Sequence, residues 1–362
     1  MNSYSNLKEK YKKIIRNCEL CESSNSKVFQ KLGRSEEPGV YGNVRITICL
    51  DCGFKMLNPR FEDDFYIEYY NKMYREIAFG DIKPSTSYIN EQKRRGKGVL
   101  NFVTSNDIKV GKMLDHGCAS GCTMIPWINE GWQCHGIDPH RPSVQLGNEL
   151  GLKIKIASGE KLPFKDNSFD LVLSLGSLEH SYDFEASMIE IRRVLKNNGY
   201  LMIRWRSDKI FGSPLEYYNH NHYRFFTPNT WKIAIKKFGF TIINYTDEKL
   251  EGWESYSYLL VKKVETVPNL KDIKKFINNK KINNANEELK KIKKIRDCYY
   301  KRSKSFIDIY KVSDGNYNKI LESIEIKKLS WNFLGGDLNQ VLQRSFLEAK
   351  KYTLLYQENK IN

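Results

Sequence analysis

Residues 113–123 read MLDHGCASGCT, and this stretch decides the fold. The apolar run at 112–117 ends in a loop where Gly117 and Gly121 stand four positions apart. A strand that leads through such a loop into a helix is typical of a site where the backbone approaches a bound cofactor. The same stretch holds His116, Cys118 and Cys122, so a metal site is the alternative.

Short apolar runs alternate with helical stretches after this loop. This alternation predicts an α/β fold with a doubly wound, Rossmann-like parallel sheet. The last two runs follow each other closely, and we expect them to form an antiparallel pair at one edge. The expected strands lie at 112–117, 134–139, 154–158, 169–175, 200–205, 241–246 and 257–263.

The details of the loop separate the cofactor classes. Dinucleotide sites use a G-x-G-x-x-G pattern, and phosphate-binding P-loops use a Lys-Ser/Thr pair; this loop has neither. Asp138 lies 21 residues beyond Gly117, at the end of the next expected strand. A carboxylate at that place can accept hydrogen bonds from both hydroxyls of a ribose.

Four segments in this order resemble the class I S-adenosylmethionine-dependent methyltransferases. MLDHGCASGCT is similar to their first motif and GIDPH to their second. ASGEKLPFKDNSFDLVLSLGSLEH resembles the segment through their fourth strand, and EIRRVLKNNGYLMI resembles their helix and fifth strand. The four motifs lie between residues 113 and 203. In this family a cysteine in the loop is ordinary, so the resemblance argues against a metal at Cys118 and Cys122.

The resemblance implies S-adenosylmethionine as the cofactor and assigns a set of contacts. The two loop glycines would admit its amino-acid tail, Asp115 would reach its ammonium through water, and Asp138 would hold the ribose. Two positions depart from the family: Ala119 replaces the usual middle glycine, and Ser158 replaces the acid that accepts from the adenine amino group. The implied cofactor residues are Asp115, Gly117, Ala119, Gly121, Asp138, Pro139, Ser158, Gly159, Ser174 and Leu175.

Four cysteines form a separate pattern near the N-terminus. Cys18-x-x-Cys21 and Cys49-x-x-Cys52 place two pairs of thiols on two tight turns, as in a zinc ribbon. The stretches KVFQKLGRS and NVRITICL are expected to be strands between the pairs. Four protein ligands leave no open position, so the predicted Zn²⁺ is structural. The alternative is four unrelated thiols.

The pattern predicts four segments along the chain. These are a zinc ribbon at 1–60, a helical connector or lid at 61–108, the methyltransferase domain at 109–263 and a lysine-rich helical domain at 264–362. The last segment holds 21 Lys/Arg against 12 Asp/Glu, out of a net charge of +16 for the whole chain. Such a charge suits nucleic acid, but no RNA-binding signature accompanies the lysines, so a solvated helical region is the preferred interpretation.

The ribbon and the connector resemble parts of the methyltransferases of bacterial sugar and glycan gene clusters. The stretch EYYNHNHYRFFTP at 216–228 resembles the histidine-rich Y-H-E-H segment of their sugar C-methyltransferases. His222 matches that family's base and His220 its neighbour, whereas Asn221 replaces the glutamate and Asn219 the tyrosine. The helical C-terminal region replaces a second α/β domain of those enzymes, which puts carbon methylation in doubt.

These residues predict methyl transfer to a sugar hydroxyl, with an imidazole removing the proton near neutral pH. His222 is the first candidate for the base, followed by His180 and His220; packing against Phe225 or capping near Thr227 is the structural alternative for His222. Tyr70, Tyr74 and Tyr218 are expected to contact the acceptor. The alternatives are a sugar C-methyltransferase, an rRNA or tRNA methyltransferase and a non-catalytic binding module.

The composition also sets the expected surroundings. No apolar run reaches the roughly 18 residues of a membrane span, and the N-terminus lacks the apolar core of a signal peptide. We therefore expect a cytoplasmic protein with a small-molecule substrate, namely a sugar nucleotide or glycan. The apolar stripe of the last expected helix is a candidate homodimer contact.

Overall fold

The structure of the protein is a computed structural model. It describes residues 7, 10–32, 44–72, 85–206, 222–252, 256–279, 284–290, 292, 293 and 308. The helices expected at 294–362 lie almost entirely outside these residues, so the homodimer contact stays a prediction.

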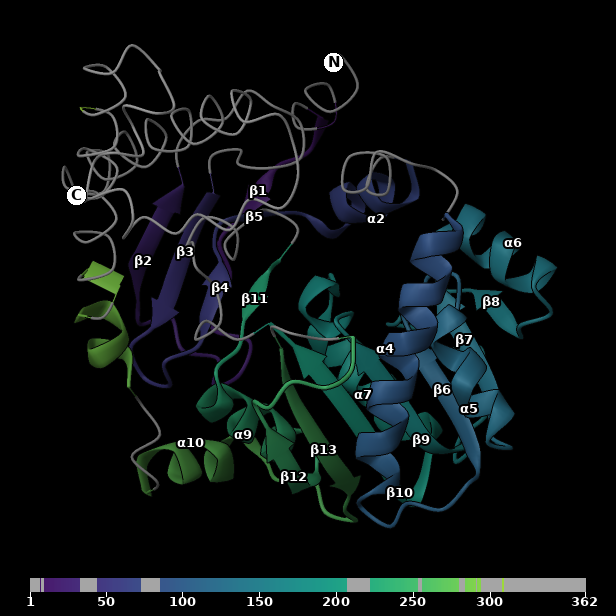
Figure 1. Cartoon of the computed structure of the whole chain (residues 1–362). Helices are drawn as coiled ribbons and strands as arrows, with labels where there is room; N and C mark the ends of the chain where they lie inside the picture. The colour runs from purple at the N-terminus through teal and green to yellow at the C-terminus, as the bar shows by residue number, and fades with distance from the viewer. Residues whose placement is uncertain are drawn as a thin grey trace.

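A sheet of seven strands forms the centre of the described chain, in the order β12-β13-β10-β9-β6-β7-β8 (Figure 1). The sequence predicted this α/β architecture, and the prediction is confirmed. β13 runs antiparallel to both of its neighbours, and the other pairings in the sheet are parallel. The strands are β6 (Lys112–His116), β7 (Gln133–Asp138), β8 (Ile154–Ile156), β9 (Phe169–Leu175), β10 (Leu195–Trp205), β12 (Phe240–Thr246) and β13 (Ser257–Lys263).

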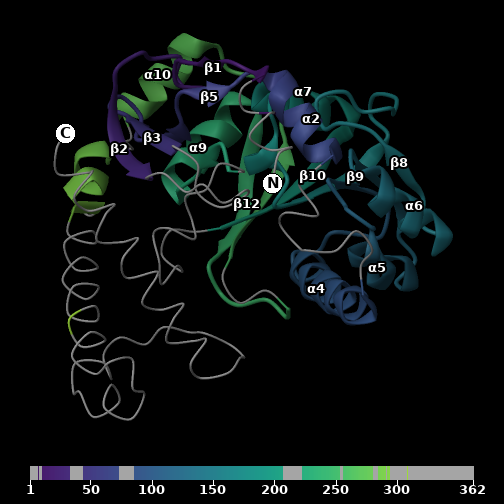
Figure 2. The same ribbon diagram turned by 90° about the horizontal axis from the view of Figure 1, so that it is seen from above.

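Helices cover both faces of this sheet. Figure 2 shows α4 and α5 on one side and α7, α9 and α10 on the other, and separate apolar clusters fill the two faces. The 3₁₀ helix η1 (Cys122–Met124) follows the glycine loop, and η2 (Leu178–His180) follows β9. The α-helices are α4 (Thr86–Thr104), α5 (Ile125–Asn129), α6 (Arg141–Glu149), α7 (Phe184–Val194), α9 (Pro228–Lys237) and α10 (Leu270–Asn279).

The N-terminal part forms a second sheet, of four strands in the order β11-β4-β3-β2. The two strands expected between the cysteine pairs are β2 (Ser26–Leu32) and β3 (Val44–Cys49). β4 (Lys55–Leu57) follows. β11 (Arg224–Phe225) comes more than 160 residues later in the chain and pairs antiparallel with β4. This strand was not expected from the sequence. Strands β1 (Lys13–Ile14) and β5 (Arg60–Phe61) pair with each other beside this sheet.

The ribbon and the seven-stranded sheet share one hydrophobic core. All four ribbon cysteines belong to the same buried cluster as residues of α7, α9 and β10. Phe226 links the two parts: its ring lies 5.0 Å from that of Phe54 in the ribbon and stacks on Trp231 of α9 at 3.9 Å. The ribbon is thus packed against the seven-stranded sheet and its helices.

Segments from both ends of the chain cover the outer face of the ribbon. Helix α2 (Asp63–Lys72) contributes Phe65 and Tyr69 to a second buried cluster, which also holds Ala285 and Ile292. The Lys55 side chain is fully buried there and pairs with Glu288 at 3.0 Å. No helix within the described residues is long and apolar enough to cross a bilayer.

Helix α4 approaches the segment after the glycine loop closely at Gly96. A Cβ at this position would lie 2.1 Å from the carbonyl oxygen of Thr123, a backbone atom that cannot turn away. We expect Gly96→Ala to lower the free energy of unfolding by about 1–3 kcal/mol, as for other overpacked sites. Chemical denaturation measures this. Lys97→Ala, at an exposed position of the same helix, is the control, and an equal stability of the two variants would contradict the close approach.

Candidate active site

The glycine loop leaves β6 with three left-handed residues. The φ angles are +76° at Gly117, +50° at Ala119 and +69° at Gly121. A Cβ on Gly117 would lie 2.5 Å from Cβ of Ser177, so this position also requires glycine for space. Ala119 adopts a conformation that disfavours a side chain, and the departure from the family glycine thus carries a conformational cost of about 1 kcal/mol.

Asp138 ties this loop to the end of β7. Its Oδ2 accepts a hydrogen bond of 2.8 Å from the backbone N–H of Ala119, and its Oδ1 accepts one of 2.8 Å from that of His140. Each carboxylate oxygen has a second lone pair that can accept from a ribose hydroxyl. The carboxylate is therefore held in place by backbone donors before any ligand binds.

Asp115 lies behind the loop rather than at its surface. The side chain is 2% exposed, and its Oδ2 accepts a hydrogen bond of 2.6 Å from the Thr123 hydroxyl. Burial raises the pKa of Asp115 to about 6, against the opposing effect of this hydrogen bond. A positive charge nearby, such as the cofactor's ammonium, would favour the ionised form.

A cavity of about 450 Å³ opens beside the loop, within the size range of small-molecule sites. Six of the predicted cofactor residues line it: Gly117, Ala119, Asp138, Pro139, Ser158 and Gly159. Asp115, Gly121, Ser174 and Leu175 do not. The lining after β9 consists instead of Gly176 and Ser177, one step further along the chain.

His116 also lines the cavity, and the sequence analysis did not assign it a role there. Its Nδ1 lies 2.9 Å from the hydroxyl oxygen of Ser177, which donates to the His116 carbonyl at 2.6 Å. Burial lowers the pKa of His116 to about 4, so the ring is neutral at pH 7. A Cβ on Gly159 would lie 2.2 Å from its Nε2, so the ring shapes the wall. The sequence offered one signal for this role, namely that His116 stands directly before the first glycine of the loop.

Tyr70 and His180 line one end of the cavity, and His222 packs against His180 without lining the cavity itself. The Tyr70 hydroxyl lies 2.9 Å from Nδ1 of His180. The ring of His222 lies 4.5 Å from that of His180. The structure thus brings together three of the predicted acceptor-side residues. Tyr74, Tyr218 and His220 lie outside the described residues.

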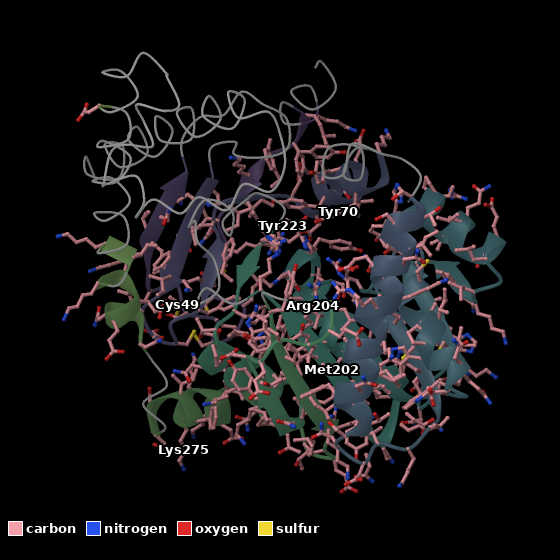
Figure 3. The ribbon with its side chains drawn as sticks, viewed as in Figure 1. Cys49, Tyr70, Met202, Arg204, Tyr223 and Lys275 are labelled. Carbon is pink, nitrogen blue, oxygen red and sulfur yellow. The ribbon has the colours of Figure 1, made fainter. Side chains whose placement is uncertain are left out.

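Glu179 stands beside this histidine pair. Donor atoms of Glu179, His180 and His222 lie within 4.8 Å of one another. Burial raises the pKa of Glu179, and the Arg204 guanidinium opposes the shift. Arg204 already supplies a positive charge next to the carboxylate, which disfavours a divalent cation there. The cluster is better suited to accept or donate a proton. Figure 3 labels Arg204 on β10 of the central sheet, Tyr70 on α2, and Tyr223 just before β11.

The ribbon cysteines gather as their spacing predicted. All four are buried, and their sulfur atoms lie within 4.8 Å of one another. Cys18 Sγ is 3.5 Å from Cys52 Sγ, and Cys21 Sγ is 3.6 Å from Cys49 Sγ. Sulfurs bound to a tetrahedral Zn²⁺ at 2.3 Å would lie about 3.8 Å apart, so the arrangement fits the ion.

A buried ion cluster joins the ribbon to the acceptor side. Glu19 accepts from Arg224 through both carboxylate oxygens, at 2.5 and 2.9 Å, and forms an ion pair with Arg60 at 2.9 Å. Burial alone would raise the pKa of Glu19, but the two guanidiniums outweigh it and lower this pKa to about 2. Loss of one partner from such a buried cluster costs about 3–5 kcal/mol.

Comparison with known proteins agrees with this geometry. Residues 114–203 match the family model described as a methyltransferase domain. These residues run from the strand before the glycine loop to the fifth parallel strand and include most of the cavity wall. The chain thus contains a class I S-adenosylmethionine-dependent methyltransferase domain.

Curated relatives match part of the chain. A sterol 4-C-methyltransferase of Caenorhabditis elegans is 30% identical over 119 residues, which are 31% of this chain and 35% of the relative. A ubiquinone biosynthesis O-methyltransferase of Pelagibacter ubique is 32% identical over 98 residues, which are 25% of this chain and 40% of the relative. The chain therefore spans less than half the length of these relatives.

One solved structure similar to this chain is a 1,6-didemethyltoxoflavin-N1-methyltransferase of Burkholderia thailandensis with bound 1,6-didemethyltoxoflavin and S-adenosylhomocysteine. It is 17% identical, with a TM-score of 0.39, and the match covers 50% of this chain and 82% of the other.

We expect the buried carboxyl of Asp115 to lower the stability of the ligand-free protein and to strengthen the binding of S-adenosylmethionine. Its folded pKa of about 6 lies above the unfolded value of about 3.9, so ionisation lowers the stability of the ligand-free protein as the pH rises from about 4 to about 6. We expect Asp115→Asn to remove this loss and to raise the free energy of unfolding at pH 7.5 by about 1–3 kcal/mol. We expect the same variant to bind S-adenosylmethionine at least about tenfold more weakly.

Urea denaturation at pH 4.5 and 7.5 tests the stability, and calorimetric titration tests the binding. Asp107→Asn, at a position outside the cavity wall, is the control. A variant Asp115→Asn with the same pH dependence of stability as the parent protein would show that Asp115 is ionised without cost.

Proposed function

We propose that the protein transfers a methyl group from S-adenosylmethionine to a hydroxyl of a polar small molecule, namely a nucleotide-linked sugar or a glycan intermediate. The observation that carries this proposal is His180 in the wall of the cofactor cavity, hydrogen-bonded to Tyr70 and packed against His222. When bound, the cofactor supplies an electrophilic methyl group.

The residues of this site would divide the work of an in-line displacement. Asp138 and the glycine loop orient the cofactor, and the tyrosine and histidines hold the acceptor hydroxyl in line with the methyl group. The oxygen–carbon bond forms as the carbon–sulfur bond breaks and its electron pair stays on sulfur. His222 takes the hydroxyl proton, and His180, fixed by Tyr70, borders it.

The cavity wall is mainly apolar, but it contains a few polar groups that could bind a polar acceptor. Tyr70, His180 and Tyr182 all line the cavity, and together they offer hydroxyl and imidazole groups to an acceptor that carries hydroxyls. The relatives act on sterols, quinones or malonyl-acyl carrier protein according to their names, so the support for a sugar comes from this wall and from the resemblance of residues 216–228. Methylation of a sugar carbon is the second candidate, because the same imidazoles could take a proton from carbon.

We further infer that Cys18, Cys21, Cys49 and Cys52 hold one structural Zn²⁺. The two turns are closed in the same way, since the backbone N–H groups of Glu22 and Gly53 donate to the carbonyls of Cys18 and Cys49 at 2.8 and 2.9 Å. Four thiolates satisfy the ion completely, so it contributes to folding and takes no part in the transfer.

Methyl-labelled S-adenosylmethionine offers a direct test of the transfer. We expect label to enter a nucleotide-sugar extract with the parent protein and not with Asp138→Ala, which removes the carboxylate between loop and ribose. Replacing His222 by Ala should lower kcat by about 10²–10⁴-fold and remove the acid limb of the pH profile, because a general base is lost. His135→Ala is the control, because this histidine of β7 packs against Phe164 and Phe169, away from His180 and His222.

Label in unmodified RNA and not in the sugar fraction would contradict the sugar acceptor and favour a nucleic-acid methyltransferase. An unchanged turnover of His222→Ala at every pH would remove His222 from the mechanism. Label in neither fraction, together with no binding of S-adenosylmethionine, would favour a binding module.

Metal analysis tests the ribbon. We expect about one zinc per chain in the purified protein, and less than about a tenth of that in Cys49→Ser, which should also unfold at a lower temperature. Cys134→Ser, which changes a buried cysteine outside the four-sulfur cluster, should keep its zinc. Zinc-free protein with an intact ribbon fold would contradict the metal site.

A further inference from the structure

Glu19 lies between the two cysteines of the first pair of the ribbon, and its side chain contacts the segment that carries His222. Its carboxylate receives two hydrogen bonds from Arg224, which stands 205 residues further along the chain and two residues after His222. The Arg224 side chain is fully buried, so it depends on this carboxylate for the neutralisation of its charge.

Arg224 and Arg60, the two arginines that contact Glu19, also bind the backbone directly after His180. Arg224 Nη1 donates to the carbonyl of Ser181, and Arg60 Nη2 donates to that of Tyr182 at 2.8 Å. The Glu19 carboxylate thus holds both guanidiniums in the orientation in which they bind residues 181 and 182. Ser181 and Tyr182 both line the cavity.

The backbone next to His222 is fixed between the same two parts. The N–H of Tyr223 donates to the carbonyl of Glu179 at 3.1 Å, and its carbonyl accepts from Leu57 of the ribbon at 2.9 Å. Tyr223 therefore connects the turn that carries His180 to a ribbon strand. Both histidines are each held within two residues of a contact that leads to the ribbon.

We propose that Glu19 is a positioning residue of the methyl-transfer site, which transmits the geometry of the ribbon to His180 and His222. This inference rests on the proposed role of these histidines in the transfer. The ribbon would then serve the reaction as well as stability, because the cysteine pair around Glu19 fixes the point from which its carboxylate reaches Arg224.

The test compares Glu19→Gln with Glu22→Gln, an exposed position in the same cysteine turn. The chain has six histidines, so their side-chain NMR signals are few enough to assign by mutation. We expect Glu19→Gln to shift the signals of His180 and His222 and to lower kcat for the acceptor at least about tenfold. The zinc content and the affinity for S-adenosylmethionine should stay within about twofold of the parent values, since neither site is touched. Glu22→Gln should leave all four measurements unchanged.

Unchanged histidine signals and kcat in a folded, zinc-loaded Glu19→Gln protein would overturn the proposal. If that variant does not fold, Glu19→Asp decides, because it keeps the charge and shortens the reach: histidine shifts at normal zinc content support positioning, and their absence overturns it. If the parent protein methylates no acceptor, the proposed function fails, yet the histidine signals still decide whether Glu19 positions the pair.

Discussion

Two buried guanidiniums share the carboxylate of Glu19, and this ion cluster connects the ribbon to the backbone of residues 181 and 182. A buried charge without a partner is strongly unfavourable, so Arg60 and Arg224 can lie where they do only if the ribbon brings Glu19 to them. The cluster therefore fixes how the ribbon sits on the methyltransferase domain. The shared apolar core and the pairing of β11 with β4 act in the same direction.

The cofactor side differs, because its strained residue, Ala119, and its unfavourably buried carboxyl, Asp115, lie within one short stretch of the chain. Ala119 adopts a left-handed conformation, and its N–H is thereby placed on the carboxylate of Asp138. Asp115 is buried at a cost to the ligand-free protein, and a bound ammonium would offset that cost. Such features lower stability in the absence of ligand and prepare the site for a charged one.

The sequence predicted the parts that depend on local pattern. All seven strands of the central sheet were expected, because apolar runs of strand length alternate with helical segments, and the first loop was found from Gly117 and Gly121. Strand β11 was missed, since two residues carry no periodicity and the pairing with β4 spans more than 160 residues. The contact between Glu19 and Arg224 was missed for the same reason. Gly176 and Ser177 take the place expected of Ser174 and Leu175 because the backbone turns toward the cavity only after β9 ends.

The two sides of the cavity are thus built in different ways. The predicted cofactor side comes mainly from residues 115–160, with Gly176 and Ser177 after β9 added to it. The proposed acceptor side takes Tyr70 from α2, His180 from the turn after β9 and His222 from the segment before β11, and the ribbon connects the last two. A change in the ribbon or in the segment before β11 can therefore reshape the acceptor side without disturbing the glycine loop. The matching family model accordingly covers residues 114–203, which include the glycine loop and leave out the ribbon, α2 and His222.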